Sequence, residues 1–320
     1  MNLEEAIEKY GIAVPSDEEF YSEEYRAYFE GKRPQGKEHF ERYRQFQEIY
    51  TKSFYVTFKQ NQDEEGLSTA DSQAVVLGGQ AGAGKTALVH VAKREFKAQG
   101  KKVFLIDDDM YRMFYPNAQE ILRECPEYFT KITAIGSGNV TPKILKYASD
   151  NGLNFIFDGT LKNDRIIQTS NAWHNYSVNW KIIGTSYEES ALSIFERNEA
   201  LRKIGEGRLV PIEAHDETYL GLEPTLALLE KNGNNGRIQV YGRGEDIFNP
   251  HLQYDSMEKG IYATAVEALV ATRKKDRERC LRSKIKERIR RLKNSSIPLN
   301  KQEQEALAAM EERIKTEMER

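Results

Sequence analysis

The residues with the clearest chemical pattern form one glycine-rich run. It matches the pattern GxxxxGK[ST] at every defined position and reads Gly79-Gln80-Ala81-Gly82-Ala83-Gly84-Lys85-Thr86. Glycines let a backbone bend so that its N–H groups converge on phosphate oxygens, and a following helix adds a favourable dipole. We expect Lys85 to reach the β- and γ-phosphates of ATP and the Thr86 hydroxyl to hold Mg²⁺. The alternative is a glycine-rich turn with an incidental lysine, and the flanking strand and helix patterns argue against it.

Acidic residues follow two further apolar runs of the chain. Asp107, Asp108 and Asp109 come directly after VFLI, and Asp158 follows NFIF. In an open α/β sheet, ligands bind beyond the carboxyl ends of the strands. Phosphoryl transfer to an alcohol needs a carboxylate that orients the hydroxyl and takes its proton, and we favour Asp109 for this role. We expect Asp107 either to hold metal-bound water or to cap the next helix, and Asp108 to be only a cap or turn residue.

Three arginines lie in the later run IFERNEALRKIGEGR, namely Arg197, Arg202 and Arg208. An arginine near the β/γ bridge of a nucleotide neutralises the charge that develops during transfer. A helix followed by a glycine-flanked arginine is typical of a mobile lid that excludes water, and we place such a lid near residues 197–215. A solvated helix face is an equally good interpretation of these arginines from the residues alone.

The elements that must position these side chains alternate along the middle of the chain. Apolar runs predict strands, and helical spacing with Pro or Gly at the ends predicts the helices between them. Pro142 is expected at the start of one helix. The pattern predicts an α/β fold, a P-loop NTPase-type parallel sheet with helices on both faces. The predicted strands are residues 74–79, 101–109, 153–160, 178–186 and 236–243, and the helices are residues 85–100, 141–152 and 189–207.

Composition divides the chain into three predicted parts. Residues 1–70 are polar and aromatic-rich and form a helical N-terminal extension, which ends in a loop. Residues 71–255 form the P-loop core, and residues 256–320 form C-terminal helices with a break at SSIPL. Spacing at i, i+4 predicts that these last helices include two sets of residues, Met257, Ile261 and Ala265, and Leu281, Ile285 and Ile289.

Charge is unevenly distributed between the two ends of the chain. The first 30 residues hold nine acids against two bases, whereas residues 273–294 hold twelve bases against three acids. The basic stretch either binds nucleic acid or a membrane surface, or is a solvated helix face with its apolar residues turned inward. We favour the second interpretation because the stretch has no aromatic residue on which a base could stack.

The overall composition restricts the class of protein further. The net charge of −3 over 320 residues argues against a general nucleic-acid binder. No run approaches the roughly 20 apolar residues that span a bilayer, and the acidic N-terminus has no apolar signal region. Two distant cysteines, Cys125 and Cys280, fit a reducing, cytoplasmic location.

Taken together, the motifs resemble those of the zeta toxins. The matching runs are VVLGGQAGAGKTAL, FLIDDDMYRMFYPN, FIFDGT, IFERNEALR and GRLVPIEAHD, in this order over about residues 74–245. The resemblance implies a bacterial kinase of a toxin–antitoxin pair, which uses ATP and Mg²⁺ to phosphorylate the sugar of UDP-N-acetylglucosamine. It also implies an antitoxin that blocks the nucleotide site with a helix, either from a separate chain or, here, in cis from residues 1–70. Extra scaffold is the alternative role of that segment.

The resemblance assigns roles residue by residue. Lys85 and Thr86 match the nucleotide loop, and Asp109 matches the catalytic base. The stretch Val140-Thr141-Pro142-Lys143 departs from the family, which tends to have an acid there facing the sugar. The remaining matches are the lid arginines Arg197 and Arg208, and the residues expected near the acceptor, Asp107, Asp158 and Thr160.

The predicted function is therefore a kinase that acts on a sugar hydroxyl of UDP-N-acetylglucosamine or a related UDP-sugar. Kinases of other nucleotide-containing acceptors, dinucleotides among them, are the first alternative. A P-loop ATPase stimulated by nucleic acid is a second, and it would require a broad basic groove. A nucleotide-binding module without chemistry is a third, against which the combination of Lys85, Thr86, Asp109 and the arginines argues.

Overall fold

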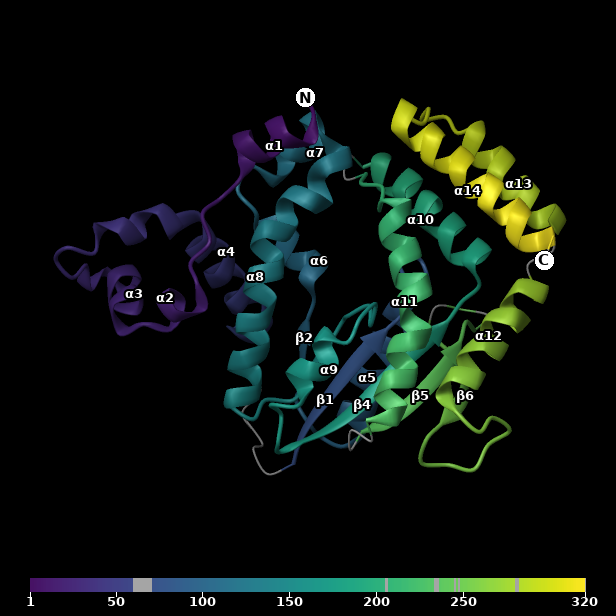
Figure 1. Cartoon of the computed structure of the whole chain (residues 1–320), viewed down its shortest axis with the longest axis horizontal. Coiled ribbons are helices and arrows are strands. Elements are labelled where there is room, and N and C mark those ends of the chain that lie inside the picture. The colour runs from purple at the N-terminus through teal and green to yellow at the C-terminus, as the bar shows by residue number, and fades with distance from the viewer. Residues whose placement is uncertain are drawn as a thin grey trace. The chain divides into compact units, whose positions relative to one another are not determined.

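The computed structural model describes residues 1–59, 71–204, 207–232, 236–244, 246, 248–279 and 282–319. The chain forms two compact units, and Figure 1 traces their elements. One unit comprises Met1–Glu65 and Ile106–Ala148, and the other comprises Gly66–Leu105 and Ser149–Arg320. The second unit contains the central sheet.

The sheet has six strands in the order β2-β3-β1-β4-β5-β6. β1 runs parallel to β3 and to β4, and β4 runs parallel to β5, which confirms the predicted α/β fold. β6 pairs antiparallel with β5 at the edge of the sheet and was not predicted. The strands are β1 (Ser72–Gly78), β2 (Phe104–Ile106), β3 (Phe155–Phe157), β4 (Tyr176–Gly184), β5 (Arg237–Gly242) and β6 (His251–Asp255).

Helices cover both faces of this sheet. Ile183 of β4 belongs to a buried apolar cluster with Leu88 and Phe96 of α5, so its side chain faces that helix. The next residue, Gly184, faces the other way, and a Cβ added to it would lie 3.0 Å from the side chain of Thr272 in α12. This alternation places α5 and α12 on opposite faces, as the continuous apolar strands predict.

The second unit contains seven helices among its described residues. Those predicted at residues 85–100 and 189–207 correspond to α5 and α10, and α11 was not predicted. α10, α13 and α14 share a second apolar cluster (Figure 1). The helices are α5 (Lys85–Ala98), α9 (Arg165–Ser170), α10 (Tyr187–Arg202), α11 (Ile212–Lys231), α12 (Ala265–Arg279), α13 (Arg282–Lys293) and α14 (Lys301–Glu319).

The predicted helical position of Met257 and Ile261 is wrong. α12 begins only at Ala265, and both earlier side chains are exposed. The helix starts where the Thr264 hydroxyl accepts a hydrogen bond from the backbone N–H of Glu267, at 3.1 Å, which is an N-cap contact. Met257 and Ile261 therefore have helical spacing relative to Ala265 only by coincidence, since both precede the first residue of α12.

The first unit is helical throughout its regular elements. An aromatic cluster that includes Tyr25, Phe40 and Tyr43 forms part of its core. Its elements are α1 (Leu3–Tyr10), α2 (Asp17–Tyr21), α3 (Glu23–Ala27), η1 (Tyr28–Lys32), η2 (Glu38–Tyr43), α4 (Arg44–Phe54), η3 (Tyr55–Lys59), α6 (Asp108–Tyr111), η4 (Arg112–Phe114), α7 (Ala118–Glu124), η5 (Pro126–Tyr128) and α8 (Phe129–Asp150).

Pro142 lies inside α8 and does not start a helix, so that prediction is wrong. The turns before it are held by packing, because a Cβ on Gly136 would lie 2.8 Å from Ile49 and 2.9 Å from Tyr115. This close tertiary approach keeps the segment helical although proline removes one hydrogen bond of the helix. No helix within the described ranges has the length and apolar content needed to cross a membrane.

Candidate active site

The backbone of the glycine-rich loop has the left-handed turns that its glycines permit. It connects β1 to α5, and Gly82 and Gly84 have φ of 75° and 100°. Gly82 is constrained a second time, because a Cβ there would lie 2.0 Å from the backbone oxygen of Ser190 in α10. The loop thus requires glycine for its conformation and for the close approach of α10.

Polar side chains fix the outside of this loop to the start of α10. Gln80 is fully buried, and its amide donates hydrogen bonds to the Thr185 carbonyl at 3.0 Å and to the Ser190 hydroxyl at 3.1 Å. The Thr185 hydroxyl donates in turn to the carbonyl of Ala83 at 2.9 Å. These bonds use the amide nitrogen of Gln80, while its Oε1 is buried without a hydrogen-bond partner.

Lys85 and Thr86 are the first residues of α5, where helix N–H groups have no partner within the helix. The Lys85 ammonium donates to the carbonyl of Gly79 at 3.2 Å, so the side chain folds back along the loop. The Thr86 side chain is exposed. An ammonium, a helix N-terminus and glycine-rich backbone together fit a polyphosphate, and an exposed hydroxyl fits a Mg²⁺ ligand.

The residues after β3 lie next to the same loop. The carbonyl of Thr160 accepts a hydrogen bond from the backbone N–H of Gly79 at 3.2 Å. A Cβ on Gly159 would lie 3.3 Å from the carbonyl oxygen of Leu77 in β1. The Asp158 side chain is half-buried and that of Thr160 is exposed. The second unit therefore brings these two predicted acceptor residues to the sheet edge that carries the loop.

The arginines of the predicted lid differ in their surroundings. Arg197 lies exposed on α10, and Arg208 is half-buried between α10 and α11. Arg202 instead pairs with Glu303 of α14 at 2.9 Å and donates to the Pro298 carbonyl at 2.7 Å, which is a structural role. Residues 205–206 of the predicted lid lie outside the described residues, so the lid stays a prediction.

The three acids after β2 belong to the first unit. Asp107 is the N-cap of α6 and accepts from the backbone N–H of Asp109 at 2.9 Å. Asp108 pairs with Arg112 at 2.6 Å and accepts a hydrogen bond from the Thr141 hydroxyl at 3.0 Å. Asp109 is exposed, and Arg112 contacts its carboxylate at 3.2 Å. Asp109 thus presents the most accessible carboxylate of the three.

Arg112 is a residue that the sequence analysis missed. Only 12% of its side chain is exposed, and it also donates to the Thr130 carbonyl at 2.8 Å. It lies three residues after Asp109 and four after Asp108, which is the helical spacing for an ion pair. That spacing within FLIDDDMYRMFYPN was the signal that could have identified it.

A buried polar chain behind the phosphate loop was also missed. The Ser190 hydroxyl lies 2.9 Å from Nε2 of His215, whose Nδ1 lies 3.0 Å from Asp216. Asp216 pairs in turn with Arg313 of α14. The run AHD provided the signal, since it puts a histidine and an acid side by side. Because Ser190 and His215 are fully buried, these residues support the loop and α10.

The basic stretch at residues 273–294 pairs with the acids of α10. Arg288 of α13 contacts Glu189 at 2.5 Å and Glu196 at 2.7 Å. Burial alone would lower the pKa of Arg288. The hydrogen bonds that its guanidinium donates to these two carboxylates raise the pKa above its ordinary value. Arg277 of α12 pairs with Glu188 at 3.0 Å.

The apolar residues of the same stretch behave as the favoured interpretation predicts. Ile285 and Ile289 are buried in the cluster that α13 shares with α10 and α14. Leu281, the third predicted member, lies outside the described residues. The described part of the stretch therefore belongs to α12 and α13, with apolar residues of α13 turned inward and several cations bound to the neighbouring α10.

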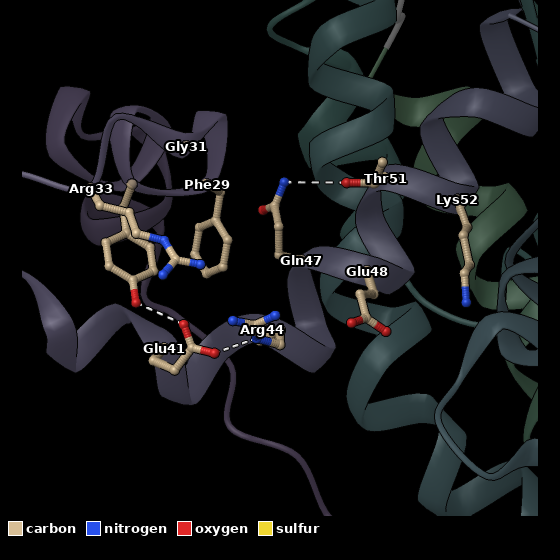
Figure 2. Close-up of a pocket in the computed structure, with 10 residues that line it drawn as sticks. Phe29, Gly31, Arg33, Glu41, Arg44, Gln47, Glu48, Thr51 and Lys52 are labelled. Atoms are coloured by element: carbon tan, nitrogen blue, oxygen red, sulfur yellow. Dashed lines mark hydrogen bonds and ion pairs between the residues drawn. The ribbon is translucent and has the colours of Figure 1, made fainter.

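A pocket of about 320 Å³ lies in the first unit between η1 and α4 (Figure 2). Glu41 accepts a hydrogen bond from the Tyr28 hydroxyl at 2.7 Å and pairs with Arg44, which Figure 2 shows beside it. Gln47 donates to Thr51 at 3.3 Å, one turn further along α4, and both residues line the pocket. None of the predicted site residues lines it.

Comparisons with known proteins find one family. The family model described as Zeta toxin matches residues 60–253. The Toxin PezT of Streptococcus pneumoniae serotype 4 is 30% identical over 198 residues, which cover 60% of this chain and 75% of the relative. A Toxin zeta of Enterococcus hirae is 29% identical over 204 residues, covering 60% and 70%.

Solved structures agree with this result. A structure from the PezAT chromosomal toxin–antitoxin system of Streptococcus pneumoniae aligns with a TM-score of 0.62 and 25% identity, over 77% of this chain and 97% of that one. A chain of the AvrRxo1-ORF1:AvrRxo1-ORF2 complex aligns with a TM-score of 0.51 and 15% identity, over 96% and 93%, which shows a shared fold.

Proposed function

The chain belongs to the zeta toxin family, and on this premise we propose that it is an ATP-dependent kinase of a nucleotide sugar. The proposed reaction moves the γ-phosphate of ATP to a sugar hydroxyl of UDP-N-acetylglucosamine or a related UDP-sugar. The observation that supports it most is the phosphate loop, whose left-handed glycines and folded-back Lys85 suit a nucleotide's phosphate chain.

At the nucleotide end, the residues of the loop bind and orient the phosphates. Lys85 would neutralise charge on the β- and γ-phosphates, and the Thr86 hydroxyl would be a ligand of Mg²⁺. The metal would supply charge neutralisation between the two phosphates. Arg197 and Arg208 would stabilise the transferring group and exclude water, because an arginine there acts where negative charge develops.

At the acceptor end, Asp109 would orient the attacking hydroxyl and take its proton. Its carboxylate is exposed and has Arg112 as a neighbour at 3.2 Å, whereas the less exposed Asp108 is engaged by both Arg112 and Thr141. Asp107, Asp158 and Thr160 are the further proposed acceptor residues.

The stretch that lacks the family's usual acid is occupied internally. Thr141 donates to Asp108 at 3.0 Å, and Lys143 is buried and pairs with Asp17 at 2.6 Å. Neither side chain is thus presented to an acceptor as the family's carboxylate would be. This departure supports a related UDP-sugar, or another nucleotide-containing acceptor such as a dinucleotide, as the alternative substrate.

The test is a transfer assay with ATP, Mg²⁺ and UDP-N-acetylglucosamine, read by mass spectrometry for an added phosphate on the sugar nucleotide. We expect a product with the wild-type chain and a loss of at least about 100-fold with Asp109→Ala, while ATP affinity changes by less than about threefold. Intact ATP binding without product would contradict the acceptor and direct the assay to dinucleotides. Hydrolysis stimulated by DNA or RNA would contradict the kinase itself.

A protein antitoxin is the proposed partner, because the similar solved structure comes from a toxin–antitoxin system. The N-terminal segment has contacts of its own with the rest of the first unit, since the Tyr10 hydroxyl donates to Glu124 at 2.7 Å. We favour a scaffold role for this segment over inhibition in cis. Expression of the chain alone in bacteria should arrest growth, and expression of Lys85→Ala should not. Normal growth with an active, folded wild type would instead support restraint within the chain.

A further inference from the structure

Arg243 lies at the sheet edge that carries the phosphate loop. The parallel register pairs Gly78 of β1 with Ile182 of β4, and Ile182 with Val240 of β5. β5 continues two residues beyond that level to Gly242, and Arg243 follows directly. In a parallel sheet this places the arginine beyond the carboxyl ends of the strands, where ligands bind.

The guanidinium of Arg243 stands against the last glycine of the loop. Its Nε lies 3.6 Å from the position that a Cβ on Gly84 would occupy. Gly84 directly precedes Lys85. Arg243 is therefore a second cation, besides Lys85, that lies beside the glycine-rich loop. A guanidinium beside a glycine-rich loop at a helix N-terminus is well suited to bind a phosphate oxygen.

Neighbouring side chains hold Arg243 in place through one of its nitrogens. Nη1 contacts Glu189 at 2.5 Å and the Ser193 hydroxyl at 3.3 Å, both on α10. Glu189 is shared, because its other oxygen pairs with Arg288 at 2.5 Å. Arg288 has a second carboxylate partner in Glu196, at 2.7 Å, so Glu189 is not the sole counter-charge of that arginine.

We propose that Arg243 is a nucleotide-binding residue that contacts the phosphate chain of ATP, a role that rests on the proposed kinase function. The competing explanation is purely structural, in which Arg243 only ties β5 to α10. Arg237 offers a matched comparison on the same strand. It also pairs with an acid, since its Nε contacts Asp255 at 2.9 Å, but it lies at the opposite end of β5.

The experiment measures the affinity of the full-length chain for ATP and for inorganic tripolyphosphate by calorimetry, without any acceptor. Arg243→Met should weaken both by about tenfold or more, because it removes a charged donor to phosphate. Arg237→Met should leave both within about twofold and lower only the melting temperature. Arg243→Lys should recover part of the affinity because it retains the charge.

Glu189→Gln separates the two explanations. It removes the ion pair between Arg243 and α10 but retains Arg243 and its Ser193 contact, so tripolyphosphate affinity should stay equal or rise if Arg243 contacts phosphate. A loss equal to that of Arg243→Met would overturn the proposal, as would unchanged tripolyphosphate affinity in folded Arg243→Met. A wild-type chain that binds no ATP would overturn the proposed function as well, whereas wild-type binding that Arg243→Met retains would overturn only the role of Arg243.

Discussion

The phosphate loop and the basic stretch at residues 273–294 both present cations, yet their surroundings differ. Lys85 of the loop donates a hydrogen bond to the carbonyl of Gly79, and it follows glycines with left-handed backbone conformations. Arg288 of the basic stretch is held by two carboxylates of α10. A cation next to open backbone donors can bind a ligand, whereas a cation between two acids mainly stabilises the fold.

This difference shows what local composition can and cannot reveal. The loop is contiguous, so its chemistry is visible in eight residues. The partner of Arg288 at Glu196 lies 92 residues away in the sequence, so the twelve bases of the stretch cannot be interpreted without it.

The largest effect is expected from Gly82→Ala. The added methyl group would meet the Ser190 carbonyl at 2.0 Å, and φ is 75° there. We expect nucleotide affinity to fall by at least about 100-fold, since the loop must move away from α10 to accommodate it. Gly100→Ala is the matched control, because φ is 65° with nothing within 4 Å. It should cost about 1 kcal/mol of stability through strain alone and leave nucleotide affinity unchanged. Calorimetry with ATP, combined with thermal unfolding, measures both quantities.

A smaller effect is expected from Arg288→Met, which leaves Glu189 and Glu196 without this partner. The side chain of Arg288 is 22% exposed, so the loss should be about 2 kcal/mol, below the range for fully buried pairs. Arg290→Met, at an exposed position on the same helix, should change stability by less than about 0.5 kcal/mol. Urea unfolding of both variants provides the comparison. Equal stability of the two, with a loss of nucleic-acid binding in Arg288→Met, would reverse our interpretation of the stretch.

The smallest effect concerns pH and the pair between α13 and α14. The hydrogen bond from Lys293 to Glu311, at 2.6 Å, lowers the pKa of Glu311 below its ordinary value of 4.5. A lowered carboxyl pKa gives stability that is complete above the unfolded value and is lost as pH falls through the folded one. Between pH 5 and 3 the wild type should therefore lose more unfolding free energy than Glu311→Gln, by less than about 1 kcal/mol. Parallel losses in urea unfolding at these two pH values would show that the pair contributes nothing.

Several elements show which parts of the secondary structure the sequence could predict. β1, α5 and β4 were predicted because continuous apolar runs and helical spacing are local signals. β6 was missed because its sequence, HLQYD, has no continuous apolar run. Its strand conformation is apparent only from its antiparallel pairing with β5. The same limit applies to Pro142, where packing of Gly136 overrides the usual preference of proline for the start of a helix.

The sequence by itself determined the α/β class, the phosphate loop and the acids after β2, since each is a short run whose backbone and side chains act together. Only the tertiary structure decided which cations are neutralised. It also placed Arg243 beside Gly84, and connected Ser190 to His215 behind the loop. The physical reason is that charge and hydrogen-bond interactions act over a few ångströms, and the residues concerned are brought within that range only when distant helices and strands pack together.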